Sequence, residues 1–183
     1  MPENAPALSN RYHLKDGEVM ISLNDIKVAA FDFDNTLAIH REKKFMSSRA
    51  GDEDSYFLGA YADPEHFYDV EEPCTENEEL KKLISLCRER GIAMYCVTGM
   101  RTTMNCKAKD CYIRKHYGEG IEVIATAGQE RKKDVVRILT RHLQIKPEEM
   151  LFVDDLEATL DMLKETGVRG VHVSQIGALL AEQ

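Results

Sequence analysis

Apolar and polar positions along the chain follow two periods, one typical of buried strands and one typical of amphipathic helices. Short continuous apolar runs near residues 28, 92, 121, 150 and 170 predict strands that are buried on both faces. Between these runs, apolar residues recur every three to four positions and predict helices over residues 75–91, 101–116, 132–143 and 156–167. A short final helix is also expected, which Ser174 can cap. Thr75 and Glu78 are spaced as a capping box at the start of the first helix. This alternation predicts an α/β fold, a doubly wound parallel sheet with helices on both faces.

The 183 residues predict a single domain, 1–183, because no repeat or low-complexity segment divides the chain. The first 24 residues resemble a leader with a short strand near Val19–Leu23. Residues 38–73 form an insertion after the first long strand, which we expect to be a flap or small cap. Its aromatic residues form either the core of a small lid or the walls of a substrate site: Phe45, Tyr56, Phe57, Tyr61, Phe67 and Tyr68. Its basic residues either meet an anionic substrate or remain solvated: His40, Lys43, Lys44 and Arg49.

Composition and charge narrow the function classes. A hydrophobic content of 43% and a charged content of 31% are those of an ordinary globular protein. The net charge of −8 argues against nucleic acid or an anionic membrane as partner, because both require a basic surface. The chain has neither an apolar run long enough to span a bilayer nor the pattern of a signal peptide, and its five cysteines have no framework-like spacing. These features predict a cytoplasmic protein with reduced thiols.

Polar residues follow three of the predicted strands. Asp32 and Asp34 come at the end of the first long strand, Thr98 ends the strand at 92, and Asp154 and Asp155 end the strand at 150. Because parallel strands end at the same edge of their sheet, we expect these side chains to converge there. Several carboxylates at one edge repel each other unless a cation lies among them, and hard oxygen ligands suit Mg²⁺.

Carboxylates beside Mg²⁺ are suited to phosphoryl chemistry. One aspartate can attack phosphorus and form an aspartyl-phosphate. A second, two residues further along an extended chain, can give a proton to the leaving oxygen and later take one from water. That role favours a pKa nearer neutral than that of a free aspartate, which a like-charged neighbour can provide.

With these motifs the chain resembles the phosphatase branch of the haloacid dehalogenase superfamily. Four elements occur in the order typical of that family: "DFDNT" at 32–36, "VTG" at 97–99, a lysine at 132 or 133, and "FVDD" at 152–155. The resemblance implies a Rossmann-like core with the first long strand in a central position. It also implies phosphate-ester hydrolysis with Mg²⁺ as cofactor.

The resemblance assigns a role to each matching residue. It implies that Asp32 is the nucleophile and Asp34 the general acid and base, and that Thr98 binds the transferring phosphoryl oxygens. A lysine neutralises the nucleophile, and the family spacing favours Lys132 over Lys133. The metal ligands are expected to be Asp32, Asp34 through its backbone carbonyl, Asp154 and Asp155. Gly99, Arg101 and Lys133 are the expected substrate-binding residues. For Arg101 the reason is its place at a helix N-terminus, which suits phosphate.

The insertion at 38–73 is too short for a full helical cap. An open site suits either a phosphoprotein, as a macromolecular phosphoester, or a phosphorylated small molecule over which a neighbouring subunit closes in a homo-oligomer. Three alternatives use similar residues. A phospho-accepting receiver domain has its acidic pair and lysine in a different chain order, and a phosphotransferase or mutase usually requires a larger cap. A catalytically silent protein of the same fold would not need every catalytic position filled, as it is here.

Overall fold

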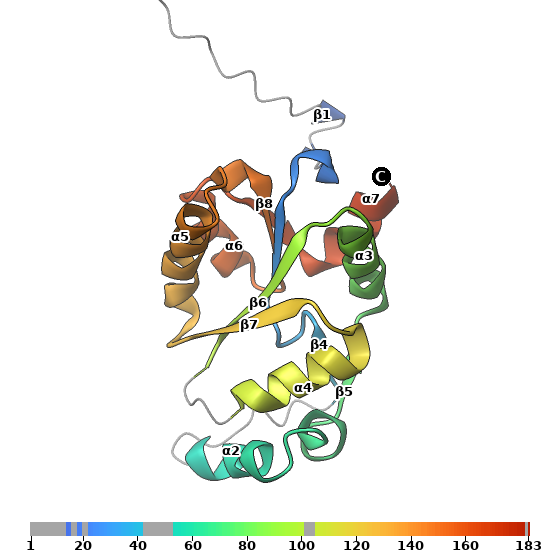
Figure 1. Ribbon diagram of the computed structural model, residues 1–183, viewed down its shortest axis with the longest axis vertical. Coiled ribbons are helices and arrows are strands. Elements are labelled where there is room, and N and C mark those ends of the chain that lie inside the picture. The colour runs from blue at the N-terminus through green and yellow to red at the C-terminus, as the bar shows by residue number, and fades with distance from the viewer. Residues whose placement is uncertain (1–13, 16–17, 20–21, 42–52, 101–104, 182) are drawn as a thin grey trace, which may run out of the picture.

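The computed structural model describes residues 14–15, 18–19, 22–41, 53–100, 105–181 and 183 (Figure 1). The strands are β1 (Leu14–Lys15), β2 (Glu18–Val19), β3 (Val28–Phe31), β4 (Ala38–His40), β5 (Cys74–Glu76), β6 (Ala93–Gly99), β7 (Ile121–Thr126), β8 (Met150–Asp154) and β9 (Arg169–His172). The α-helices are α2 (Glu53–Ala62), α3 (Glu78–Glu89), α4 (Cys106–Tyr117), α5 (Lys132–His142), α6 (Glu157–Lys164) and α7 (Ile176–Ala181). A π-helical segment spans Phe67–Glu71, and 3₁₀ turns span Leu23–Asp25, Gln129–Arg131, Pro147–Glu149 and Val173–Gln175.

A five-stranded parallel sheet forms the centre of the molecule, with the strand order β7-β6-β3-β8-β9. Strand β3 is the middle strand, and its last residue, Phe31, pairs with Cys96 of β6 and Val153 of β8. All four residues of β3 are buried, as the apolar run predicts for a strand with both faces covered. The predicted fold class, the parallel sheet and the central place of the first long strand are confirmed.

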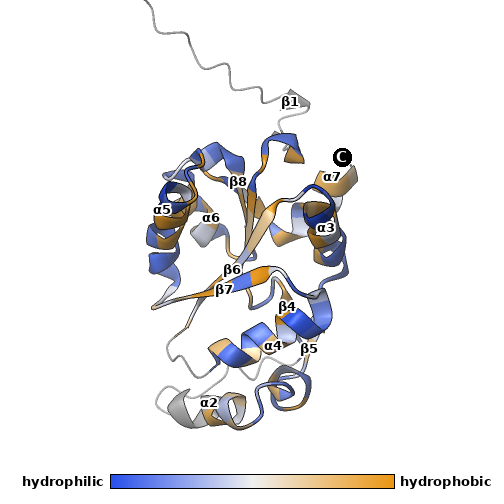
Figure 2. Ribbon diagram, viewed as in Figure 1, coloured by the Kyte–Doolittle hydropathy of each residue, from blue (hydrophilic) through white to orange (hydrophobic). Residues whose placement is uncertain are grey.

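Helices cover both faces of the sheet (Figure 1). One hydrophobic cluster joins residues of α3, α4 and α7 to one face of β3, and a second cluster joins α5 and α6 to the other face. Successive residues of β3 alternate between them, since Ala29 and Phe31 belong to the first cluster and Val28 and Ala30 to the second. Figure 2 shows the matching pattern on α3 and α5, which carry hydrophobic and hydrophilic residues on different sides.

The described part of the insertion between β3 and α3 consists mainly of two short strands, one α-helix and one π-helical segment. Strands β4 and β5 pair antiparallel as its two ends, with Ala38 opposite Glu76. Between them lie α2, which packs against α4 at one end of the molecule, and the π-helical segment (Figure 1). Beyond the central sheet, β1 and β2 also form an antiparallel pair. The insertion therefore adds one α-helix and one π-helical segment to the core within the described part of the chain.

Three local predictions differ from the structure. Thr75 lies in β5, and the helix α3 is capped by Asn77, whose side chain accepts hydrogen bonds from the backbone of Glu79 and Leu80. Thr75 is therefore not an N-cap, because the strand β5 extends one residue beyond it. Ser174 lies inside a 3₁₀ turn that His172 caps, and α7 begins at Ile176. Of the strand expected at Val19–Leu23, Val19 lies in β2 and Leu23 begins a 3₁₀ turn, while residues 20 and 21 lie outside the described residues.

Within the part of the chain that the structure describes, we find no helix with the length and apolar character that crossing a membrane requires.

Candidate active site

Three neighbouring strands end at one edge of the sheet and carry the polar residues that the sequence singles out. Asp32 directly follows β3, and its backbone N–H donates a hydrogen bond to the carbonyl of Val153 in β8. Asp154 is the last residue of β8, and Thr98 lies one residue before the end of β6. Parallel pairing with β3 on both sides sets these three residues beside one another.

A tight loop follows Asp32 and carries Asp34. Asn35 adopts a φ of +55°, a left-handed conformation that asparagine tolerates better than most residues. The loop closes through a hydrogen bond from the backbone N–H of Ala38 to the carbonyl of Phe33, at 2.9 Å. The chain then enters β4. Asp32 and Asp34 therefore face different partners, although a single residue separates them.

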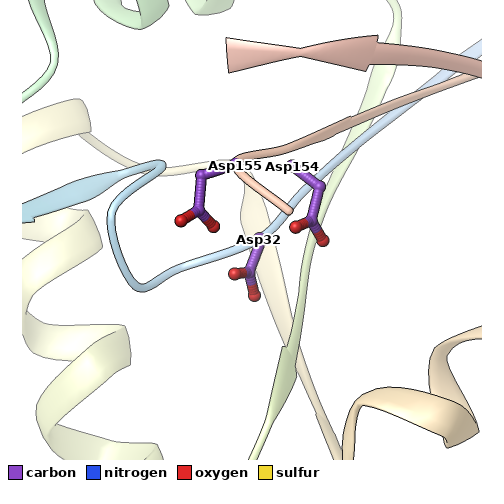
Figure 3. A group of neighbouring side chains, drawn as sticks. All are labelled: Asp32, Asp154 and Asp155. Carbon is purple, nitrogen blue, oxygen red and sulfur yellow. The ribbon is translucent and has the colours of Figure 1, made fainter. Parts of the chain in front are cut away.

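Asp32, Asp154 and Asp155 form a compact acidic group (Figure 3). One carboxylate oxygen from each lies within 4.8 Å of the others. Asp32 and Asp154 are buried, and Asp155 is partly exposed. Carboxylate oxygens are the hard ligands that Mg²⁺ prefers, and a group of three with two members buried is costly without cations. The residues present therefore fit a magnesium ion.

Lys132, the first residue of α5, lies beside two members of this acidic group. Its Nζ is 2.8 Å from Oδ1 of Asp32 and 2.8 Å from Oδ2 of Asp154, and its side chain is fully buried. The other oxygen of Asp154 accepts a hydrogen bond from the backbone N–H of Leu156. Lys133, the next residue, instead pairs with Glu165 at the surface. Lys133 therefore lies outside the acidic group, and the structure places the lysine that the family spacing favours at Asp32.

Burial and mutual repulsion shift the pKa values of this group. Burial, together with the negative charges of Asp154 and Asp34, raises the pKa of Asp32 to about 7 despite the opposing effect of Lys132. Burial and the charge of Asp154 also raise the pKa of Asp155. Burial alone would lower the pKa of Lys132, but Asp32 and Asp154 outweigh it, so that pKa is raised. Carboxylates that are this hard to ionise gain most from a bound cation.

Asp34 has its own set of partners. Its Oδ2 accepts a hydrogen bond from Nζ of Lys109 at 2.7 Å, and its Oδ1 lies 2.9 Å from Nε2 of His40. Burial by itself raises the pKa of Asp34, but the charge of Lys109 and the hydrogen bonds from both partners outweigh it and hold the pKa well below its usual range. The expectation of a raised pKa is therefore wrong, because the side chain turns to cations rather than to the other carboxylates. Its backbone carbonyl as a metal ligand stays a prediction.

Thr98 and Gly99 lie where the sequence places them. Thr98 is fully buried, and its Oγ1 accepts a hydrogen bond from Lys109 Nζ at 2.8 Å. Gly99 is the last residue of β6 and lies beside the backbone of Gln129, where an added Cβ would come within 3.4 Å of the Gln129 nitrogen. Arg101 lies outside the described residues, so its place near phosphate stays a prediction.

Sequence reasoning missed Lys109 as a site residue. It treated the inward face of the predicted helix 101–116 as apolar. Lys109 shares that face in α4, because it lies three residues before Tyr112 and both side chains are buried. A lysine on the buried face of a helix needs a charged partner, so its position was the available signal.

His40 is the second residue whose role the sequence left open. Its side chain is only 5% exposed, and it contacts Asp34 rather than solvent. Its Nδ1 lies 3.4 Å from the Sγ of Cys74, across the β4–β5 pair. The other basic residues of that group, Lys43, Lys44 and Arg49, lie outside the described residues.

Aromatic residues of the insertion pack beside this site. The ring of Tyr68 lies 4.9 Å from that of Phe33 and 5.9 Å from that of Tyr112, measured between centroids. Phe67 and Tyr68 are buried, which agrees with the packing interpretation, whereas Tyr61 is exposed. Phe45 and the side chains of Tyr56 and Phe57 lie outside what the structure describes.

Comparison with known proteins gives one family. The family model of haloacid dehalogenase-like hydrolases matches residues 39–167. That range contains Thr98, Lys132 and the Asp154–Asp155 pair, and begins after Asp34. No curated protein matches the chain.

Several solved structures have a similar fold. CbbY from Rhodobacter sphaeroides in complex with phosphate is 18% identical and has a TM-score of 0.54, over 80% of this chain and 85% of that one. The N-terminal part of BF1531 from Bacteroides fragilis, with a phosphatase domain complexed with Mg, is 17% identical and has a TM-score of 0.53, over 86% of this chain and 39% of that one. A phospho-aspartyl intermediate analogue of phosphoserine phosphatase is 16% identical and has a TM-score of 0.52, over 79% of this chain and 85% of that one. At these identities the likeness shows a shared fold.

Proposed function

The chain belongs to the haloacid dehalogenase-like hydrolases, and on this premise we propose that it is a magnesium-dependent phosphatase acting on a phosphate monoester through an aspartyl-phosphate. One observation carries the proposal: the buried Lys132 lies within 2.8 Å of both Asp32 and Asp154, inside a group of three carboxylates. A cation-paired carboxylate at the edge of a parallel sheet, beside ligands for Mg²⁺, has the parts that covalent phosphoryl transfer needs.

The ligands described for the similar structures support the same chemistry. These structures include a phosphate complex, a phosphatase domain complexed with Mg and a phospho-aspartyl intermediate analogue. In this chain Asp32, Asp154 and Asp155 would hold the metal, together with the backbone carbonyl of Asp34. When bound, Mg²⁺ would neutralise phosphoryl charge and help to orient the group being transferred.

Phosphoryl transfer to the protein is the first step of the proposed reaction. A carboxylate oxygen of Asp32 attacks phosphorus, the bond from phosphorus to the leaving oxygen breaks, and that oxygen takes a proton from Asp34. Lys109 favours the ionised form of Asp34, so this carboxyl must first receive the proton. His40, whose Nε2 lies 2.9 Å from Asp34, is in position to pass it. Lys132 lowers the repulsion between Asp32 and the incoming anion, because it lies against the nucleophile.

Hydrolysis of the aspartyl-phosphate is the second step. A water molecule attacks phosphorus and gives its proton to Asp34, while the bond between phosphorus and Asp32 breaks and phosphate leaves. Asp34 thus regains the proton that it gave to the leaving group, and Asp32 returns to its carboxylate form. In the proposed reaction the hydroxyl of Thr98 donates a hydrogen bond to a phosphoryl oxygen through both steps. The substrate belongs to the phosphorylated small molecules or the phosphoproteins.

The test is hydrolysis of a generic aryl phosphate with Mg²⁺ and with EDTA, by the wild type and by Asp32→Asn. We expect turnover that requires Mg²⁺ and disappears in the variant. Trapping of ³²P on the wild-type protein and not on the variant would support the covalent step. Turnover that Asp32→Asn retains within about tenfold would overturn the assignment of the nucleophile, because loss of a covalent nucleophile costs far more.

A further inference from the structure

Lys109 is a second fully enclosed lysine at the site, and none of the family motifs contains it. It lies in α4, outside the four motifs, and its side chain is only 1% exposed. Burying an ammonium group is costly unless charged or polar partners surround it. The partners of Lys109 are the two residues to which the proposed function gives proton transfer and phosphoryl binding, Asp34 and Thr98.

The ammonium group of Lys109 has two hydrogen-bond acceptors and one aromatic ring around it. One meets Oδ2 of Asp34 at 2.7 Å and another meets Oγ1 of Thr98 at 2.8 Å. The ammonium also lies 4.6 Å from the centre of the Phe33 ring, whose face attracts a cation. An ammonium has three N–H donors and no acceptor. Lys109 is therefore placed to hold other residues rather than to bind substrate itself.

The contact with Thr98 fixes the direction of a proton. Because an ammonium group can only donate, the Thr98 oxygen is the acceptor of this hydrogen bond. The hydroxyl proton of Thr98 must then point away from Lys109. A phosphoryl oxygen at the strand ends is the acceptor that the proposed function supplies.

We propose that Lys109 is a positioning residue that holds the Asp34 carboxylate in place and turns the Thr98 hydroxyl proton toward the phosphoryl group. This inference rests on the proposed function, because it acts through the roles given to Asp34 and Thr98. A purely structural ion pair is the competing explanation. It would stabilise the fold without affecting either role.

The first test measures binding without turnover. Beryllium trifluoride mimics a phosphoryl group on an aspartate, so its affinity in the presence of Mg²⁺ reports how well the residues around Asp32 bind that group. We expect Lys109→Met to weaken this affinity about tenfold, as the loss of one well-placed hydrogen bond does. In a Thr98→Val background the same substitution should change it less than about twofold, because the hydroxyl that Lys109 orients is gone. Equal losses in both backgrounds would overturn the inference in favour of a structural role.

The second test is kinetic. We expect Lys109→Met to lower kcat by about 10- to 100-fold, the scale of a misplaced catalytic group, with KM changed by less than about threefold. Lys107→Met is the matched control, because Lys107 lies on the same helix and is exposed. Its kcat should match the wild type. A Lys109→Met enzyme whose kcat equals that of Lys107→Met would overturn the inference.

Two further comparisons keep these outcomes distinct. Where Lys109→Met does not fold, Lys109→Gln replaces it: this variant keeps a donor and loses the charge, and the same two measurements apply. A wild type that neither binds beryllium trifluoride nor shows Mg²⁺-dependent turnover would overturn the proposed function, and this inference with it. An active wild type with unaffected Lys109 variants would overturn this inference alone.

Discussion

The ammonium group of Lys132 lies 2.8 Å from a carboxylate oxygen of Asp32, and neither side chain is more than 2% exposed. The same ammonium contacts Asp154 at an equal distance. Two carboxylates thus share one lysine, and Asp155 adds a further acidic group beside them. The balance of charge in this small volume gives the following predictions.

Removal of the nucleophile should separate activity from stability. We expect Asp32→Asn to lose at least about 10³-fold in turnover, the scale of removing a covalent nucleophile. Its midpoint of thermal unfolding without Mg²⁺ should be at or above that of the wild type, because the substitution relieves repulsion between Asp32 and Asp154. Differential scanning calorimetry in EDTA measures this. A melting temperature lowered by several degrees would mean that the pair with Lys132 outweighs the repulsion.

Stability without metal should fall between about pH 4 and pH 7. The pKa of Asp32 rises from an ordinary value of 3.8 to about 7 in the folded protein, mainly through burial. Below pH 4 both the folded and unfolded states keep this proton. As the pH rises, the unfolded state releases the proton first, and the free energy of unfolding falls until the pH passes about 7.

Asp155, whose pKa is also raised, adds to the same trend. Asp34 has the opposite shift, so its stabilising contribution is fully present above its ordinary pKa and does not vary in this range. Urea unfolding of the wild type and Asp32→Asn across this range is the measurement. As the pH rises, the free energy of unfolding of Asp32→Asn should increase relative to that of the wild type. A difference in free energy that stays constant with pH would contradict the raised pKa of Asp32.

The two adjacent lysines should behave differently. Lys132→Met leaves Asp32 and Asp154 buried without their cation, so we expect a loss of about 3–5 kcal/mol in stability and of at least about 100-fold in turnover. Lys133→Met breaks a surface pair with Glu165 and should change stability by less than about 1 kcal/mol. Chemical denaturation and steady-state kinetics measure both effects. Equal losses of turnover in the two variants would indicate that Lys133 binds substrate, contrary to its pairing with Glu165.

Magnesium should stabilise the folded protein through the acidic group. At a free concentration of about 100 times Kd, binding adds about 2.7 kcal/mol, which raises the melting temperature by roughly 5–10 °C. Asp154→Asn should lose most of this increase. Asp161→Asn, at an exposed position of α6, should keep it. A thermal shift that is equal in both variants would place the ion elsewhere.

The order of strands, helices and strand-end residues could be predicted from the sequence alone. Buried strands of a parallel sheet are continuous apolar runs, and Asp32, Thr98 and Asp154 follow directly from where those runs end. Parallel pairing then requires them to meet at one edge, whatever the details of packing. The family resemblance depends on the same local motifs.

Only the tertiary structure could decide which lysines reach that edge. Neighbouring residues on a helix point about 100° apart. The residue at which α5 begins therefore determines that Lys132 contacts Asp32 and that Lys133 contacts Glu165. Lys109 and His40 meet at Asp34 because α4 and the β4–β5 pair pack beside the loop after β3. The contact with Lys109 joins residues that are 75 positions apart in the sequence. Both contacts lower the pKa of Asp34 where local reasoning predicts a rise, because the nearest charges in space are not the nearest along the chain.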